Sequence, residues 1–290
     1  MQVVLYVLLL VCFVEAKTLQ EIEQDKKEII NSLPIEGEEK NTIADIVDSS
    51  FNLRAYKENY FLPVSYRYDS EYVDDAAHGH RSKSMETEFQ VSIRYDFTSN
   101  LFGLGEIYSF GYTQRAWWQL YTESAFFRET NYQPEIFVTV PTYKFLKNSY
   151  LKGLKFAYIH QSNGRGGVYE RSWNHLSATA FLFYRNIIGE FEMWYRIKDK
   201  NDYNPQLLDY IGYGQFKCVV PYKQHLFKLT LRSNVRKRKS SVELSYSYPL
   251  PLRQESDLFV YIKSFNGYGE SLIDYNHNVN KLSIGLAISR

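Results

Sequence analysis

Polar and apolar residues alternate along most of the chain from residue 59 onwards. Residues 89–97 carry an apolar side chain at every odd position and a polar one at every even position, and residues 281–288 show the same alternation. Successive side chains of a β-strand point to opposite faces of a sheet. The pattern therefore predicts strands with one apolar and one polar face.

Ten weaker segments with the same alternation accompany these two. They cover residues 59–67, 105–119, 134–144, 154–162, 173–185, 190–198, 209–220, 225–233, 241–249 and 257–265. About 9 to 11 tilted residues cross the hydrocarbon core of a membrane. Outer-membrane barrels of a single chain have an even number of antiparallel strands. We therefore predict an all-β fold, a transmembrane antiparallel β-barrel of about 12 strands.

Composition separates this fold from a soluble one. Aromatic residues make up 17% of the chain, yet the mean hydropathy is −0.40, so apolar residues are plentiful but interleaved with polar ones. A soluble sandwich or lipocalin-like barrel would use the same alternation. Aromatic residues at the apolar positions, as in interfacial girdles, and charges at many polar positions favour the membrane barrel.

The N-terminal region has a different composition. Residues 1–16 form an apolar run that ends at Ala16, and they predict a signal peptide. Residues 17–58 are polar and rich in acidic side chains, and they predict a periplasmic arm; residues 59–290 would form the barrel domain. After the signal peptide no apolar run reaches 18 residues, so a spanning helix is not expected.

Charge and cysteine content narrow the possible partners. The net charge is +1 and no basic stripe stands out beyond residues 236–239, which argues against nucleic acid as a partner. Removal of the signal peptide would leave Cys218 as the single cysteine, so no internal disulfide is expected.

Candidate chemistry lies on two neighbouring predicted strands. In the segment 154–162, His160 and Ser162 share a parity with Phe156 and Tyr158, so they are expected to face lipid. Asn174, on the next strand, would stand beside His160 on the same wall. Polar side chains that face lipid carry a free-energy cost, so their presence indicates a function. A nucleophile, Ser162, a general base, His160, and an amide that orients the base would supply one.

The residues alone leave a second interpretation open. A His-x-Ser pair is common in polar strands, and these side chains could belong to a solvated barrel rim. Residues 164–167 fit a flexible hairpin turn. The alternative to an enzyme is a non-catalytic barrel, either a porin or a surface-interaction protein, which has no need of polar side chains on its outer wall.

Longer motifs resemble a known family. Residues 160–165, His-Gln-Ser-Asn-Gly-Arg, and residues 171–174, Arg-Ser-Trp-Asn, resemble the signature of the outer-membrane phospholipase A family. Residues 112–120, 127–132 and 268–276 agree with it as well. The resemblance runs from about residue 59 to the last strand, and it implies a barrel in the outer membrane of a Gram-negative bacterium.

The resemblance implies an activity and a site. The family hydrolyses acyl esters of membrane phospholipids as a phospholipase A1/A2, requires calcium and is activated as a homodimer; cleavage of lysophospholipids is left open. Ser162 would be the nucleophile, His160 the general base and Asn174 the residue that orients it. The backbone amide of Ser162 and a water on the calcium would form the oxyanion hole. Metal ligands would come from the Arg165 carbonyl, from Glu170 and from Ser124 of the partner subunit.

This chain departs from the family pattern at several positions. Glu170 stands where the family has serine, and a carboxylate is a better ligand for a hard cation. The acidic residues of a second calcium site fall on Gly167 and Tyr203, which puts that site in doubt although Asp202 is adjacent. Gln114 matches a polar residue of the family's dimer face, and we expect Trp117 and Trp118 in girdle and dimer packing. Both tryptophans lie in the third predicted strand.

Overall fold

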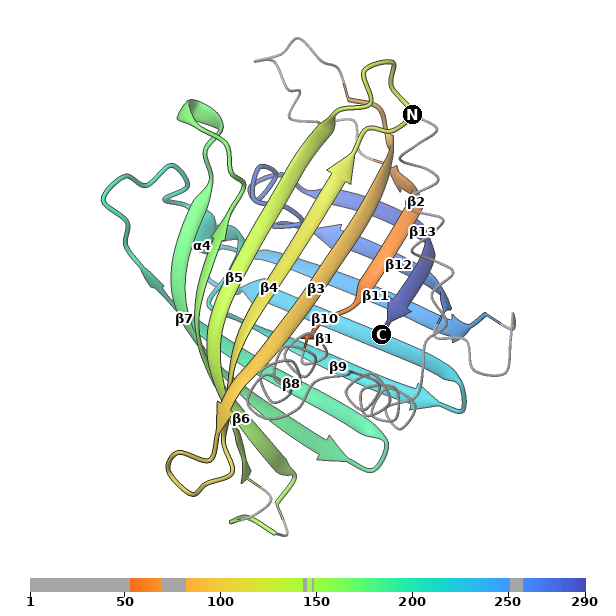
Figure 1. Ribbon diagram of the computed structural model, residues 1–290. Coiled ribbons are helices and arrows are strands. Elements are labelled where there is room, and N and C mark those ends of the chain that lie inside the picture. Colours follow the sequence, from red (N-terminus) through yellow and green to blue (C-terminus); the bar gives the residue numbers. More distant parts are fainter. Residues whose placement is uncertain (1–52, 69–81, 143–144, 148, 251–257) are drawn as a thin grey trace, which may run out of the picture. The chain divides into compact units, whose positions relative to one another are not determined.

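The computed structural model describes residues 53–68, 82–142, 145–147, 149–250 and 258–290. The predicted signal peptide and most of the predicted arm lie outside these ranges. Arg54–Pro249 and Leu258–Arg290 form one compact unit, a β-barrel with strongly tilted strands (Figure 1). Among the described residues, no helix has the length and apolar character needed to cross a membrane.

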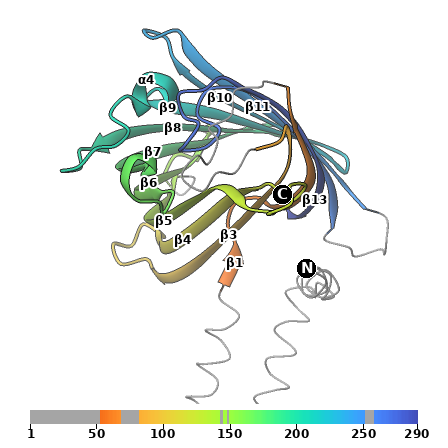
Figure 2. The same cartoon turned by 90° about the horizontal axis from the view of Figure 1, so that it is seen from above.

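Twelve strands form the wall of the barrel in the described part of the chain. They are β2 (Asn59–Arg67), β3 (Met85–Ser99), β4 (Ile107–Trp118), β5 (Phe127–Pro141), β6 (Leu151–Ser162), β7 (Ser172–Tyr184), β8 (Ile187–Ile197), β9 (Gly214–Tyr222), β10 (His225–Asn234), β11 (Lys239–Pro249), β12 (Phe259–Gly267) and β13 (Val279–Ser289). Each strand pairs with the next, and β13 pairs antiparallel with β2, so the sheet closes (Figure 2). A short strand, β1 (Leu53–Ala55), lies beside β3. The predicted fold class is confirmed.

One predicted strand begins as a helix in the structure. We expected a strand over residues 209–220, but a short helix, α4 (Leu207–Ile211), precedes β9. Leu207 and Ile211 are buried against Trp173 and Leu272, and this packing outweighs the local alternation. Gly212 ends the helix with a φ of +74°, and a Cβ there would lie 2.3 Å from the carbonyl oxygen of Ser233.

The two faces of the wall differ as the alternation predicts. Large apolar side chains are exposed on the outside, among them Phe156, Leu176, Phe191, Met193 and Leu244. The largest fully buried side chains include the charged residues Arg67, Arg128, Lys263, Lys281, Glu86 and Glu88. Charge is therefore concentrated inside the barrel, which is the reverse of a soluble core.

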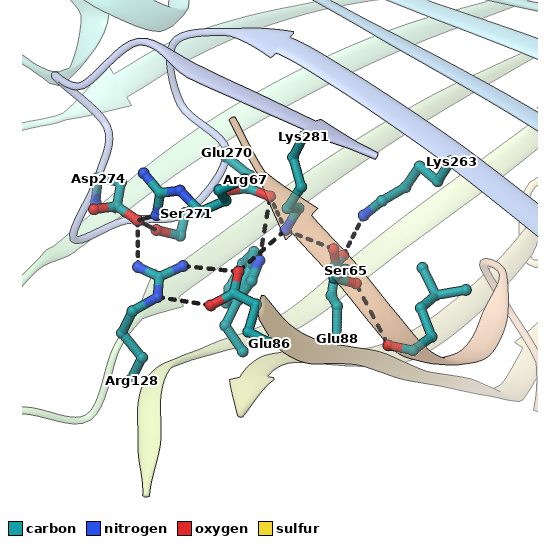
Figure 3. Close-up of polar contacts among 12 residues, drawn as sticks. Ser65, Arg67, Glu86, Glu88, Arg128, Lys263, Glu270, Ser271, Asp274 and Lys281 are labelled. Atoms are coloured by element: carbon teal, nitrogen blue, oxygen red, sulfur yellow. Dashed lines mark hydrogen bonds and ion pairs between the residues drawn. The ribbon is translucent and has the colours of Figure 1, made fainter. Parts of the chain in front are cut away.

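Buried ion pairs connect the interior charges to the loop between β12 and β13 (Figure 3). Asp274 of this loop pairs with Arg67 at 3.3 Å and also with Arg128. Lys281 pairs with Glu88 at 2.8 Å and with Glu270 of the same loop. A buried charge is tolerated when it is paired. The loop between β12 and β13 is thus fastened to the inner wall by its two carboxylates.

The end of the predicted arm also contacts the inner wall. Tyr56 stacks on Phe137 with ring centroids 5.1 Å apart, and Lys57 Nζ lies 2.9 Å from Glu135 Oε1. Glu58 pairs with Lys228. Residues 55–58 border an internal cavity of about 810 Å³. This part of the arm therefore belongs to the packing of the barrel interior.

One expectation about the tryptophans is wrong. Trp117 points into the barrel, is fully buried and donates from its indole Nε1 to Glu270 Oε1 at 3.3 Å. Trp118 points the other way and stacks on Phe127, with ring centroids 5.4 Å apart. Adjacent residues of a strand face opposite sides, so two consecutive tryptophans cannot both belong to an outer girdle.

Candidate active site on the outer wall

The strands β6 and β7 bring the predicted triad together. Their register pairs His160 with Asn174 and Ser162 with Ser172. On β6, Phe156 and Tyr158 are exposed, whereas Ala157 and Ile159 are buried in the interior. Because side chains alternate along a strand, His160 and Ser162 share the outer face with Tyr158. Their predicted orientation is confirmed.

A hydrogen bond joins two members of the triad. Nδ1 of His160 lies 2.8 Å from Oδ1 of Asn174. Two further contacts hold the same amide: the hydroxyl of Tyr158 donates to Oδ1 at 3.0 Å, and Nδ2 donates to Oδ1 of Asp199 at 2.7 Å. Because a carboxylate only accepts, the amide nitrogen must face Asp199 and the amide oxygen must face His160.

This arrangement fixes the tautomer of the imidazole. Since Oδ1 of Asn174 accepts, Nδ1 of His160 carries a proton, and Nε2 is left with a lone pair. Ser162 stands on the same face of β6, roughly 7 Å further along the strand. In the described part of the chain, no hydrogen bond joins Ser162 Oγ to His160. Such contacts often tighten only when substrate binds.

Hydrogen bonds from one side chain hold the backbone of the loop between β6 and β7. Buried Asn163 accepts from the backbone N–H groups of Arg165 at 3.3 Å and Arg171 at 3.0 Å, and it donates to the Tyr169 carbonyl at 2.9 Å. A turn of 3-10 helix, η2 (Gly167–Tyr169), lies within the loop. Gly164 has a φ of +64°, and a Cβ there would lie 2.9 Å from the ring of Tyr132. The hairpin predicted at residues 164–167 is present, because β6 and β7 pair antiparallel on either side of it.

An ion pair and a hydrogen bond of Arg165 tie this loop to the interior. Arg165 Nε lies 3.4 Å from Glu129 Oε2, and Arg165 Nη2 donates to the Arg128 carbonyl. Glu129 and Arg128 are buried on β5. The loop that follows Ser162 is consequently held from both its backbone and its side chains, which suits a site that must keep a fixed geometry.

The residues proposed as calcium ligands lie at one end of the barrel. Ser124 is exposed in the turn between β4 and β5, while Arg165 and Glu170 belong to the loop after β6. The described residues contain no ion pair or hydrogen bond to the Glu170 carboxylate, and no group of three or more His, Cys, Asp or Glu side chains that could hold a metal. One carboxylate with carbonyl and hydroxyl oxygens is a donor set that fits calcium.

The doubt about a second calcium site is supported by the contacts of Asp202. Its Oδ1 accepts from Arg196 Nη2 at 2.8 Å and from the backbone N–H of Asn204 at 3.0 Å. These contacts hold the loop after β8. Asp202 therefore has a structural role in this loop.

Sequence reasoning missed three residues of the site. Asn163 stands inside the family-like motif, but the alternation gave no sign that it organises the loop. Tyr158 has the same parity as His160 and could have been found from it. Asp199 lies 25 residues beyond Asn174 in the sequence. The β7–β8 register, which pairs Asn174 with the last residue of β8, would have pointed to it.

Comparison with known proteins supports one family. The family model described as Phospholipase A1 matches residues 38–288. The phospholipase A1 of Escherichia coli (strain K12) is 30% identical over 274 residues, which is 92% of each chain. The phospholipase A1 of Proteus vulgaris is 33% identical over 83% of each chain. A putative phospholipase A1 of Neisseria meningitidis is 38% identical, and this chain spans 55% of its length.

Solved structures agree with this family. The outer-membrane phospholipase dimer of Salmonella typhi with bound calcium has a TM-score of 0.74 and 30% identity, covering 82% of this chain and 92% of that one. Outer-membrane phospholipase A of Escherichia coli has a TM-score of 0.73 and 30% identity, covering 82% and 98%. The chain therefore belongs to the phospholipase A1 family, and its barrel is an outer-membrane barrel.

Proposed function

We propose that this protein hydrolyses acyl ester bonds of membrane phospholipids by a calcium-dependent reaction of Ser162, His160 and Asn174. The observation that carries the proposal is the bond between His160 Nδ1 and Asn174 Oδ1 on the outer wall, where lipid lies. An active-site variant of the Escherichia coli protein with an Asn-to-Ala substitution adds support for an asparagine in such a site.

The reaction follows from the protonation state of His160. Ser162 Oγ attacks the ester carbonyl carbon while Nε2 of His160 takes the hydroxyl proton. The imidazolium then gives this proton to the departing lysophospholipid alcohol, which leaves an acyl group on Ser162. A water molecule that loses its proton to Nε2 attacks the carbonyl carbon of this acyl group. The bond between that carbon and Ser162 Oγ then breaks, Oγ takes the proton from Nε2, and fatty acid is released. Asn174 keeps Nδ1 protonated throughout.

Calcium fits the oxygen atoms next to this site. Glu170, the Arg165 carbonyl and Ser124 of the partner subunit are the proposed ligands. When bound, the cation supplies positive charge that stabilises the negative oxygen of the transition state. The backbone N–H of Ser162 is proposed as a second donor to that oxygen.

A homodimer is part of the proposal. Gln114 is a polar residue on the outer face of β4, where it accepts from the Tyr112 hydroxyl at 3.1 Å. A polar group on an apolar wall is stabilised when it pairs across an interface. The Salmonella typhi relative was solved as a dimer with calcium. Dimerisation would complete the metal site, so the monomer would be inactive even though membrane phospholipids surround it.

One experiment decides between the enzyme and a non-catalytic barrel. The purified protein in detergent micelles should release fatty acid from a diacyl phospholipid when calcium is present and stop with EDTA. Ser162→Ala should fold, shown by the heat-dependent gel mobility of barrels, and be inert. Ser233→Ala is the matched control, because Ser233 is an exposed serine on β10. Equal turnover by Ser162→Ala and wild type would exclude the triad.

A further inference from the structure

The amide of Asn174 has a partner that lies outside the triad. Its Nδ2 donates to Oδ1 of Asp199 at 2.7 Å. Asn174 pairs in register with Ile197, the last residue of β8, and Asp199 follows two positions later in the loop. The chain leaving β8 therefore passes beside Asn174, and the half-buried carboxylate of Asp199 points back to the amide.

An asparagine amide can be turned by 180° with little change in shape. In the turned orientation its NH₂ group would face Nδ1 of His160, which would then have to accept. The imidazole proton would move to Nε2, and the ring could no longer take the proton of Ser162. The triad therefore needs an element that selects one orientation of the amide.

Asp199 is the contact that makes this selection. The hydroxyl of Tyr158 also bonds to the amide, but a hydroxyl can donate or accept and would tolerate either orientation. A carboxylate only accepts, so it requires the amide nitrogen. We propose that Asp199 is a positioning residue whose carboxylate holds Asn174 in the orientation that leaves Nε2 of His160 able to accept a proton. This inference rests on the proposed function.

The other contacts of Asp199 leave it free for this role. Among the described residues, its carboxylate has no further hydrogen bond or ion pair. The neighbouring acid, Asp202, differs in this respect, since it pairs with Arg196 and with the backbone of Asn204. Asp202 thus holds the loop after β8, whereas the hydrogen bond of the Asp199 carboxylate goes to Asn174.

Steady-state kinetics of phospholipid hydrolysis in mixed micelles test the proposal. Asp199→Ala should lower kcat by about 10-fold to 100-fold, with KM changed by less than about twofold, because orientation of the base is lost but not lipid binding. Asp199→Asn should recover part of the rate, since its own carbonyl can accept from Nδ2 of Asn174. Asp209→Ala is the control: this partly exposed acid on α4 pairs with Lys237 at 3.0 Å, and its substitution should leave kcat unchanged.

A double-mutant cycle separates positioning from a structural effect. In an Asn174→Ala background there is no amide to orient, so adding Asp199→Ala should cost no further activity. The same non-additivity should appear in the rate at which a fluorophosphonate ester labels Ser162. An equal loss in both backgrounds would mean that Asp199 acts on the loop alone, and it would overturn the proposal.

The outcomes distinguish this inference from the proposed function. Wild-type kcat in Asp199→Ala, with Ser162→Ala inert, would overturn the role of Asp199 and leave the triad intact. Full turnover by Ser162→Ala would overturn both. If heat-dependent gel mobility shows that Asp199→Ala does not fold, Asp199→Asn replaces it in the same double-mutant cycle. A lower kcat in the wild-type background with no change in the Asn174→Ala background supports the proposal. An equal decrease of kcat in both backgrounds contradicts it.

Discussion

Asn174 stands between a base and an acid, with its Oδ1 2.8 Å from Nδ1 of His160 and its Nδ2 2.7 Å from Oδ1 of Asp199. The amide can accept from His160 and donate to Asp199 at the same time. A carboxylate in its place could accept from His160 but could not donate to Asp199. A charged orienter would stabilise the developing imidazolium more strongly than an amide, but here it would face a like charge.

The first prediction follows from this pairing. Asn174→Asp places a second carboxylate oxygen where Nδ2 now contacts Asp199, and the repulsion should displace the side chain from His160. We expect kcat to fall by about 10-fold or more. Adding Asp199→Asn supplies an amide that can donate to the new carboxylate, so the double variant should be more active than Asn174→Asp alone. Rates of fatty-acid release check this, and a further loss in the double variant would contradict it.

The second prediction concerns Glu170. Its carboxylate has no ion pair or hydrogen bond among the described residues, and a carboxylate is the strongest oxygen ligand available for calcium in the loop after β6. Glu170→Ala should raise the calcium concentration that gives half of the maximal activity, by about 10-fold, with little change at saturating calcium. Calcium titrations of Glu170→Ala and of Asp209→Ala, as the control, measure it. An unchanged requirement would remove Glu170 from the metal site.

Alternation along the sequence predicts the twelve strands and the outward orientation of His160, Ser162 and Asn174, because side-chain direction in a strand depends only on parity. The alternation gives the wrong element where burial of side chains against the rest of the barrel determines the local structure. The segment before β9 becomes helix α4 because Leu207 and Ile211 are buried against Trp173. The inward direction of Trp117 does follow from parity, since it shares the inner face with Thr113 on β4, and its indole there donates to Glu270.

The same limit applies to the site. The triad lies on two paired strands, so sequence and resemblance can place it. Asp199 belongs to a loop, and its position depends on where β8 ends and how the chain leaves it. The alternation of polar and apolar residues does not predict the course of a loop. Asp199 is therefore found only once the contact with Asn174 is seen.

The third prediction compares two glycines of the loop after β6. Gly164 has a φ of +64° and a Cβ there would meet the ring of Tyr132 at 2.9 Å, whereas Gly166 has a φ of −113° and open space around it. A left-handed conformation costs an alanine about 1–2 kcal/mol. Gly164→Ala should therefore loosen the loop, increase its cleavage by protease and lower kcat, while Gly166→Ala should resist protease as wild type does. Equal protease sensitivity of the two variants would contradict this.

The last prediction concerns acid stability. Burial would raise the pKa of Asp274, but Arg128 and Arg67 outweigh it and hold the pKa at about 2, below the ordinary value of 3.8. A carboxyl group whose pKa is lowered by folding stabilises the folded state above its unfolded pKa. That contribution, about 2 kcal/mol, is lost as the pH falls from about 4 through about 2.

Asp274→Asn removes this titration together with the charge that faces two buried arginines. The variant should unfold at a lower urea concentration at pH 7, and its unfolding free energy should change less than that of wild type between about pH 4 and pH 2. Asp209→Asn is the control and should keep the wild-type slope, because Asp209 lies on α4 and pairs with Lys237, away from the buried arginines. If Asp274→Asn kept the wild-type slope in this range, the acid sensitivity would have to come from other carboxylates of the interior, and the fastening of the loop between β12 and β13 by Asp274 would not control it.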